Sequence, residues 1–159
     1  MITQDRLKEL LSYDPLTGVF LWRVARKGIQ KGAIAGYIAA DGYRRIRVDL
    51  VQYKAHRLAR LYMKGAFPTR KTDHRNGIRH DNKWTNLRDA NNFINSQNKR
   101  VAQSNNKAGF LGVSHKGNRF FARIGIDGKE IQLGAYDTPQ EAHCAYLVAK
   151  RTFHEGCTI

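Results

Sequence analysis

The chain of 159 residues has few of the features of proteins that are cross-linked by disulfides or metals, or that are bound to membranes. Its two cysteines, Cys144 and Cys157, form no Cys-x-x-Cys pair, which argues against a disulfide framework and against a structural zinc site. No apolar run approaches the ~20 residues of a membrane span. The N-terminus also lacks the basic and then apolar layout of a signal peptide. We therefore expect a soluble cytoplasmic protein with no membrane partner.

Acidic residues are scarce as well. Only 13 Asp and Glu stand against 28 Lys and Arg, which gives a formal net charge of +15 at pH 7. An excess that large favours a polyanionic partner, usually nucleic acid. Residues 1–108 carry a net charge of +14 and residues 109–159 only +1. Attraction to phosphate is therefore expected mainly from the first two thirds of the chain, and binding should weaken steeply with salt.

The N-terminal part of the chain predicts a small α/β scaffold. A helix of about nine residues should begin after Thr3, which is a typical N-cap residue. Strands are expected at 19–24 and 43–50, where apolar and polar residues alternate. In the second of these strands, Arg45 and Arg47 should face away from the core.

A second helix is predicted at 54–64, ending at Gly65. Its leucines should point inward, and Arg60 should lie on an outer, basic face. His56 stands near the start of this helix with no acidic residue close to it in sequence. A buried histidine hydrogen-bonded to the backbone is the expected role for His56.

Residues 71–99 concentrate the side chains with catalytic potential. A short strand should end at the pair Asp73-His74, a second strand should begin at Asn86, and a helix starting near residue 90 should carry Asn95. An acid, an imidazole and a carboxamide can then converge from two strands and one helix. This set is sufficient to hold one hard divalent cation beside a general base, as phosphodiester hydrolysis requires.

These residues resemble the HNH nuclease family, in the H-N-N form found in phage and intron-encoded homing endonucleases. Asp73-His74, Asn86 before Leu87, and Asn95 follow the order and spacing of that family. The resemblance implies a β-β-α metal (His-Me finger) core at about 69–100. It implies that His74 is the general base and that Asp73 and Asn95 are metal ligands. Asn86 would bridge the hairpin and orient His74.

The cofactor implied by this resemblance is one divalent cation. The last family position is Asn here instead of His, which favours Mg²⁺ or Mn²⁺ over zinc. Asn91, Asn95 and Asn98 would share one face of the predicted helix, so Asn91 or Asn98 can take the place of Asn95 as the ligand.

After a polar linker at 101–108 the pattern changes to three alternating strands and a helix. The strands are expected at 110–116, 119–127 and 129–137. The helix should start with a capping box, Thr138-Pro-Gln-Glu141.

This layout, with Gly112-Val113, Leu133-Gly134 and Tyr136-Asp137-Thr138, resembles the ethylene-response-factor (Apetala-type) DNA-binding domain of plants over residues 109–156. The resemblance implies that the sheet enters the major groove. Alternation places Ile131 against the helix.

Basic and polar side chains around the core and on the outer face of this sheet are the candidates for DNA contact, because Arg reads guanine and Gln reads adenine in the major groove. They are Arg45, Arg47, Arg75, Arg79, Lys83, Lys99, Arg100, Ser114, Lys116, Arg119, Arg123 and Gln132.

The sequence therefore predicts an α+β protein with a nuclease domain at 1–100, a linker at 101–108 and a DNA-binding domain at 109–156. The N-terminal α/β scaffold should support the metal core, and the last domain should be a three-stranded antiparallel sheet packed on one helix. The expected activity is homing-type cleavage of double-stranded DNA, nicking one strand and leaving 5′-phosphate and 3′-hydroxyl ends, by a monomer or weak dimer. The alternatives are a DNA-binding regulator with an inactive core and an RNA-binding protein.

Overall fold

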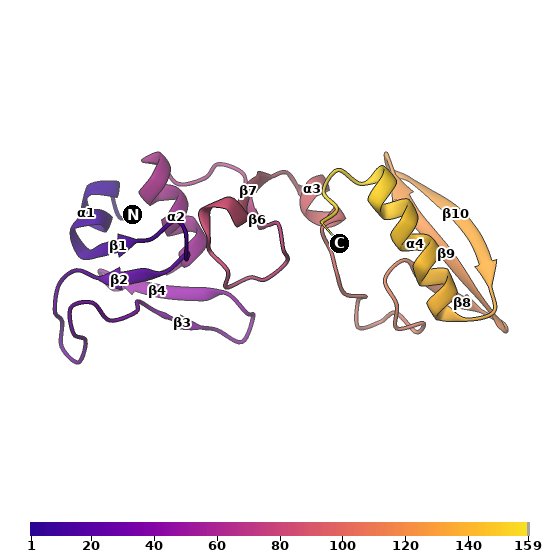
Figure 1. The fold of residues 1–159 in the computed structure, drawn as a ribbon, viewed down its shortest axis with the longest axis horizontal. Helices are drawn as coiled ribbons and strands as arrows, with labels where there is room; N and C mark the ends of the chain where they lie inside the picture. The colour runs from indigo at the N-terminus through magenta and orange to yellow at the C-terminus, as the bar shows by residue number, and fades with distance from the viewer. Residues whose placement is uncertain (159) are drawn as a thin grey trace. The chain divides into compact units, whose positions relative to one another are not determined.

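The computed structural model describes residues 1–158, and the chain divides into two compact units, Met1–Asn91 and the part from Asn92 onward (Figure 1). Four α-helices and four small antiparallel sheets are present in the described residues, so the fold is of mixed α and β type. The division falls before the domain boundary predicted at residue 100. The helix that carries Asn95 consequently belongs to the second unit.

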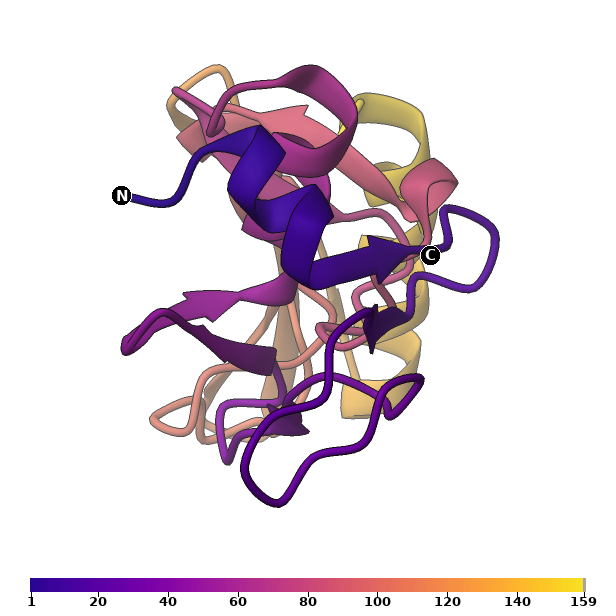
Figure 2. The ribbon, with the colours of Figure 1, turned by 90° about the vertical axis from the view of Figure 1, so that its left-hand side faces the viewer.

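The first unit begins with a helix that runs directly into a strand. Helix α1 (Gln4–Leu10) starts at Thr3, whose hydroxyl accepts a hydrogen bond from the Arg6 backbone N–H at 3.3 Å, so the predicted N-cap is confirmed. Strand β1 (Leu11–Tyr13) follows without a loop (Figure 2) and pairs antiparallel with β2 (Phe20–Trp22). Strand β1 was not predicted, because its first residue also extends the apolar stripe of the helix.

A second sheet consists of β3 (Tyr37–Ile38), β4 (Arg44–Val48) and β5 (Val51–Lys54), and it leads into α2 (Ala55–Lys64). The turn between β4 and β5 holds Asp49 and Leu50 at φ values of 45° and 66°. Left-handed backbone is unusual for leucine, so the sequence did not indicate this hairpin. Helix α2 ends at Gly65 with a φ of 79°, as predicted.

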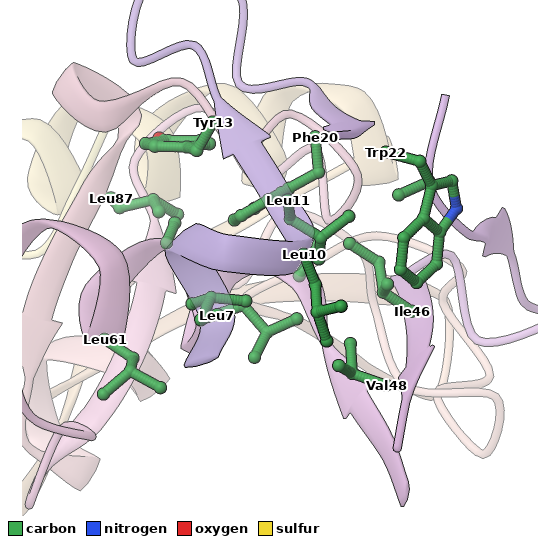
Figure 3. Packing of buried hydrophobic residues seen from close by; sticks show 14 residues of the cluster. Leu7, Leu10, Leu11, Tyr13, Phe20, Trp22, Ile46, Val48, Leu61 and Leu87 are labelled. Atoms are coloured by element: carbon green, nitrogen blue, oxygen red, sulfur yellow. The ribbon is translucent and has the colours of Figure 1, made fainter. Parts of the chain in front are cut away.

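The hydrophobic core of the first unit lies between α1, the two sheets and α2 (Figure 3). Leu7, Phe20 and Ile46 expose no surface, and the Tyr13 ring stacks on Phe20 with centroids 4.7 Å apart. Each side chain of this size contributes about 1.5–3 kcal/mol when fully buried. Leu87 joins the same core from a later strand and so anchors the hairpin that carries the candidate site.

That hairpin pairs β6 (Lys71–His74) with β7 (Leu87–Ala90), and a 3-10 helix, Trp84–Asn86, precedes β7. Strand β6 is as predicted. The returning strand extends to Ala90, into residues expected to be helical. Arg60 of α2 was expected on an outer face, but it is buried, with its guanidinium over the Trp84 ring and 3.3 Å from Asp89.

The second unit contains α3 (Asn92–Gln97), β8 (Val113–Lys116), β9 (Arg119–Ile126), β10 (Lys129–Tyr136) and α4 (Pro139–Phe153). Helix α4 packs on the sheet of order β10-β9-β8 (Figure 1). Its capping box is confirmed, with Thr138 and Glu141 each bonding the other's backbone N–H at 3.2 Å. Ile131, expected against the helix, is 43% exposed. No helix in residues 1–158 is long and apolar enough to cross a membrane.

Candidate active site

His74 ends strand β6 and is 3% exposed. Its ring meets the His56 ring in a T-shaped arrangement, with centroids 5.1 Å apart and planes at 85°, and the centroid of the Tyr43 ring lies 5.9 Å away. Burial lowers the pKa of His74 below its ordinary value of 6.5, although its hydrogen bond with Asn82 acts in the opposite direction. The imidazole is therefore neutral at pH 7, which is the form that a general base requires.

His56 of α2 is buried beside His74, but it lacks the backbone hydrogen bond expected from the sequence. Its Nδ1 is buried and has no hydrogen-bond partner among residues 1–158. Burial lowers the pKa of His56 to about 3, and the nearby cations Lys54, Arg57 and Arg60 act in the same direction. Two neutral imidazoles thus lie together, and the Tyr43 ring packs against both of them.

Two asparagines organise the loop between β6 and β7. The Asn86 amide accepts a hydrogen bond from the Asn76 backbone N–H at 2.9 Å and donates to the Asp81 carbonyl oxygen at 2.7 Å, so it braces the loop. Asn82 makes a hydrogen-bond contact with the His74 ring, with its Oδ1 3.2 Å from His74 Nε2. Asn82 was not predicted, because a buried loop asparagine has the same local sequence pattern as an ordinary turn residue.

The N-terminal β1–β2 region holds the backbone of this loop. The Tyr13 hydroxyl donates to the Asn82 carbonyl oxygen at 2.7 Å, and burial raises the pKa of Tyr13, which keeps the phenol protonated as a donor. Gly18 has a φ of 74°, and a Cβ at that position would overlap the backbone of Asn82 and Lys83. The scaffold thereby positions the loop as well as the hairpin.

Asp73 precedes His74 and is also buried. Its Oδ2 accepts hydrogen bonds from Arg88 Nε at 2.9 Å and Arg88 Nη2 at 2.8 Å. Arg88 is the residue directly opposite Asp73 in the β6–β7 register. The guanidinium offsets the charge of the carboxylate and fixes its orientation.

The asparagines that follow do not share one helix. Helix α3 spans only Asn92–Gln97, so Asn95 is helical while Asn91 precedes the helix and Asn98 follows it. The Asn98 Oδ1 accepts a hydrogen bond from the Thr158 hydroxyl at 2.6 Å. The predicted common face of Asn91, Asn95 and Asn98 is therefore wrong.

Oxygen donors are the ligand type available for a cation. Within residues 1–158, no group of three or more His, Cys, Asp or Glu side chains is placed to hold a metal ion. Asp73 offers a carboxylate and Asn95 a carboxamide oxygen, which are hard donors of the kind that suits Mg²⁺ or Mn²⁺.

The arginines predicted to contact DNA are partly paired with acids of their own unit. Arg45 bonds Asp41 at 2.8 Å, and in the second unit Arg119 bonds Asp137 and Arg123 bonds Glu130, each at 3.0 Å. Exposed ion pairs of this kind are worth about 1 kcal/mol or less, so phosphate can replace the acid.

The remaining candidates differ in exposure. The Arg79 guanidinium donates to the Asp41 carbonyl oxygen at 2.9 Å, and Arg100 donates to the Thr158 carbonyl oxygen at 2.8 Å. The Ser114 hydroxyl is buried without a partner in the described part of the chain, although the residue alternates in β8 with Val113, which packs in the core. Exposed side chains are found at Arg47, Arg75, Lys83, Lys99, Lys116 and Gln132.

Comparisons with known proteins give one distant likeness. No family model matches the chain. No curated protein matches it either. The chain is similar to the solved structure described as "DNA binding and cleavage by the HNH homing endonuclease I-HmuI", with a TM-score of 0.44 and 21% identity over 92% of this chain and 88% of that one. The function proposed below therefore rests on the residues of this protein.

Proposed function

We propose that this protein is a metal-dependent DNA endonuclease of the homing type, in which His74 is the general base. The observation that carries the proposal is the state of His74. This imidazole is buried and kept neutral by its surroundings, its Nε2 lies 3.2 Å from Asn82 Oδ1, and it follows a buried carboxylate at the end of a strand. A neutral imidazole within a strongly basic chain suits the activation of water beside a polyanion.

His74 takes a proton from water as the water oxygen attacks the phosphorus atom. The bond from phosphorus to the 3′ oxygen then breaks, which leaves a 5′-phosphate and, after protonation from solvent, a 3′-hydroxyl. Removal of the water proton in the transition state contributes about 10²–10⁴-fold to the rate. Burial of His74 keeps the base available at neutral pH.

Asp73 and Asn95 are the residues that would hold a single Mg²⁺ or Mn²⁺ ion. Asn95 is assigned on the sequence pattern. Because two protein oxygens fill only part of the coordination shell, water and phosphate oxygens would complete it. When bound, the cation stabilises the charge that develops on the scissile phosphate and on the leaving oxygen. Arg88 orients the Asp73 carboxylate.

Double-stranded DNA is the proposed substrate. The net charge of +15 supports phosphate binding by the exposed arginines and lysines of both units. The outer face of the β8–β9–β10 sheet, with Arg119, Arg123 and Gln132, is proposed as an ethylene-response-factor-like reader of the major groove. One proposed base per chain suits nicking of a single strand by a monomer or weak dimer.

The test is relaxation of supercoiled plasmid with Mg²⁺, Mn²⁺ or EDTA, comparing wild type with His74→Ala. We expect metal-dependent nicked circles from wild type, none from His74→Ala, and an equal gel shift of the plasmid by both proteins. His80→Ala, which removes an exposed imidazole from the same loop, is the matched control and should nick normally.

Binding without cleavage by wild type, repeated on a library of random duplex targets, would overturn the nuclease and indicate a DNA-binding regulator. Stronger competition by duplex RNA than by duplex DNA would indicate an RNA-binding protein.

A further inference from the structure

We propose that Asn82 is the positioning residue that sets the tautomer of His74, holding the ring proton on Nε2 so that Nδ1 is the atom that takes the proton from water. That Asn82 sets the tautomer of the imidazole is a claim about the structure alone. That Nδ1 accepts the proton from water rests on the proposed nuclease function.

The orientation of the Asn82 amide follows from its two partners. One end of the amide lies 3.0 Å from the His80 carbonyl oxygen, which can only accept a hydrogen bond. The NH₂ group must therefore face His80, and the amide oxygen must face His74. Because that oxygen can only accept, Nε2 of His74 must be the donor across the 3.2 Å contact.

The other tautomer would place two lone pairs against each other. With the proton on Nδ1, the bare Nε2 would lie 3.2 Å from the Asn82 oxygen in a buried site that leaves His74 only 3% exposed. A buried acceptor left without its donor is unfavourable, so this tautomer is disfavoured. A neutral imidazole has one N–H and one basic nitrogen, so a proton fixed on Nε2 makes Nδ1 the basic atom.

Asn82 cannot easily rotate away from this arrangement. It is 1% exposed, and its carbonyl oxygen is held by the Tyr13 hydroxyl at 2.7 Å. The backbone of Gly18 packs against it so closely that no Cβ fits between them. The scaffold thus fixes Asn82 from its backbone, and the Asn82 side chain in turn fixes the imidazole. This arrangement assigns a function to the contact between the N-terminal region and the loop.

Two variants of similar size separate the tautomer from simple packing. Asn82→Leu removes the acceptor that faces Nε2. Asn82→Asp keeps an acceptor there and loses the donor to the His80 carbonyl oxygen. Asn76→Ala is the loop control, because it removes the Asn76 side-chain bonds to Asp81 at 2.7 Å and to the Ile78 backbone N–H at 2.9 Å without replacing the Asn82 side chain. Amide NMR spectra of each full-length variant establish whether it is folded.

The first measurement is the ring ¹⁵N spectrum of His74 at a pH where the imidazole is neutral, assigned by comparison with His74→Gln. The proton should be on Nε2 in wild type and in Asn82→Asp, and both tautomers should appear in Asn82→Leu. The second measurement is metal-dependent plasmid nicking. We expect Asn82→Leu to lose about 10²-fold or more in kcat, with KM unchanged. Asn82→Asp should recover most of that loss, and Asn76→Ala should behave as wild type.

A proton on Nδ1 in wild type would overturn the proposal, whether or not Asn82→Leu folds. Equal loss of kcat in Asn82→Leu and Asn82→Asp, with unchanged tautomers, would also overturn it and reduce Asn82 to a packing residue. If wild type cuts no DNA in any metal, the proposed function fails, and the ¹⁵N spectra alone then decide whether Asn82 sets the tautomer.

Discussion

The buried pair of imidazoles makes the first unit sensitive to acid. The pKa of His56 is about 3 in the folded protein, against an ordinary value of 6.5 in the unfolded chain. Well above pH 6.5 the ring is neutral in both states and contributes no pH dependence. As the pH falls from 6.5 towards 3, His56 binds a proton in the unfolded chain but not in the folded protein, so the free energy of unfolding falls.

The size of this effect follows from the pKa difference. One pKa unit corresponds to about 1.36 kcal/mol, so His56 alone should remove about 2 kcal/mol of stability at about pH 5. Burial lowers the pKa of His74 as well, which adds to the loss in the same direction. Because small domains are stable by only about 5–15 kcal/mol, a loss of this size is readily measured.

The assay is urea unfolding followed by tryptophan fluorescence at about pH 7.5 and about pH 5. The two tryptophans, Trp22 and Trp84, both lie in the first unit, so the signal reports that unit. His56→Phe replaces the ring with one that cannot bind a proton. We expect its loss of stability on acidification to be about 2 kcal/mol smaller than that of wild type.

The control is His80→Phe, the same replacement at an exposed position, which should lose as much stability as wild type. An acid-induced loss in His56→Phe equal to that of wild type would refute the reasoning, because it would mean that the folded protein accepts a proton on His56 as easily as the unfolded chain does.

Three further predictions concern the scaffold and the second unit. Gly18→Ala should destabilise the first unit by about 1–3 kcal/mol more than Gly28→Ala. Both glycines have similar positive φ, but only at Gly18 would a Cβ overlap the backbone of another segment. Equal urea midpoints of the two variants would exclude this overlap. Tyr13→Phe should cost about 1–3 kcal/mol in the same assay, since it leaves the Asn82 carbonyl oxygen unpaired, and no change would mean that water replaces the hydroxyl. Burial lowers the pKa of Lys150, so its charge opposes folding below the ordinary value of 10.5 and the second unit should gain stability as the pH rises towards that value. The free energy of unfolding of α4, measured by amide hydrogen exchange, should therefore differ by no more than about 1 kcal/mol between Lys150→Met and wild type. A much larger loss of stability in Lys150→Met would show that the hydrogen bond from Lys150 to a backbone carbonyl outweighs the cost of burying its charge.

Local signals in the sequence predicted most of the helix ends and the strand that carries the candidate base. Thr3, Gly65 and the Thr138–Glu141 capping box act within one turn of their helices, and the structure has all three. Strand β6 ends at His74, where the polar turn residues begin. These features depend on neighbours a few residues away, and such neighbours are visible in the sequence.

Hairpins formed by tight packing were not visible in this way. Strand β1 follows a helix with no loop, and the turn into β5 uses a leucine in left-handed backbone, which no turn preference predicts. Arg60 has the sequence spacing of a surface residue. It is nevertheless buried, because its guanidinium packs on the Trp84 ring and pairs with Asp89, two residues that lie far from it in the sequence.

The candidate site divides in the same manner. The sequence by itself determined the candidates for the proposed chemistry, namely the Asp73-His74 pair, Asn86 and a basic surrounding. Only the tertiary structure decided which groups control that chemistry. Arg88 meets Asp73 through the strand register, and Asn82 meets His74 because Tyr13 and Gly18 hold its loop. The physical reason is that burial and hydrogen-bond partners, which set pKa and tautomer, come from segments that meet only when the chain is folded.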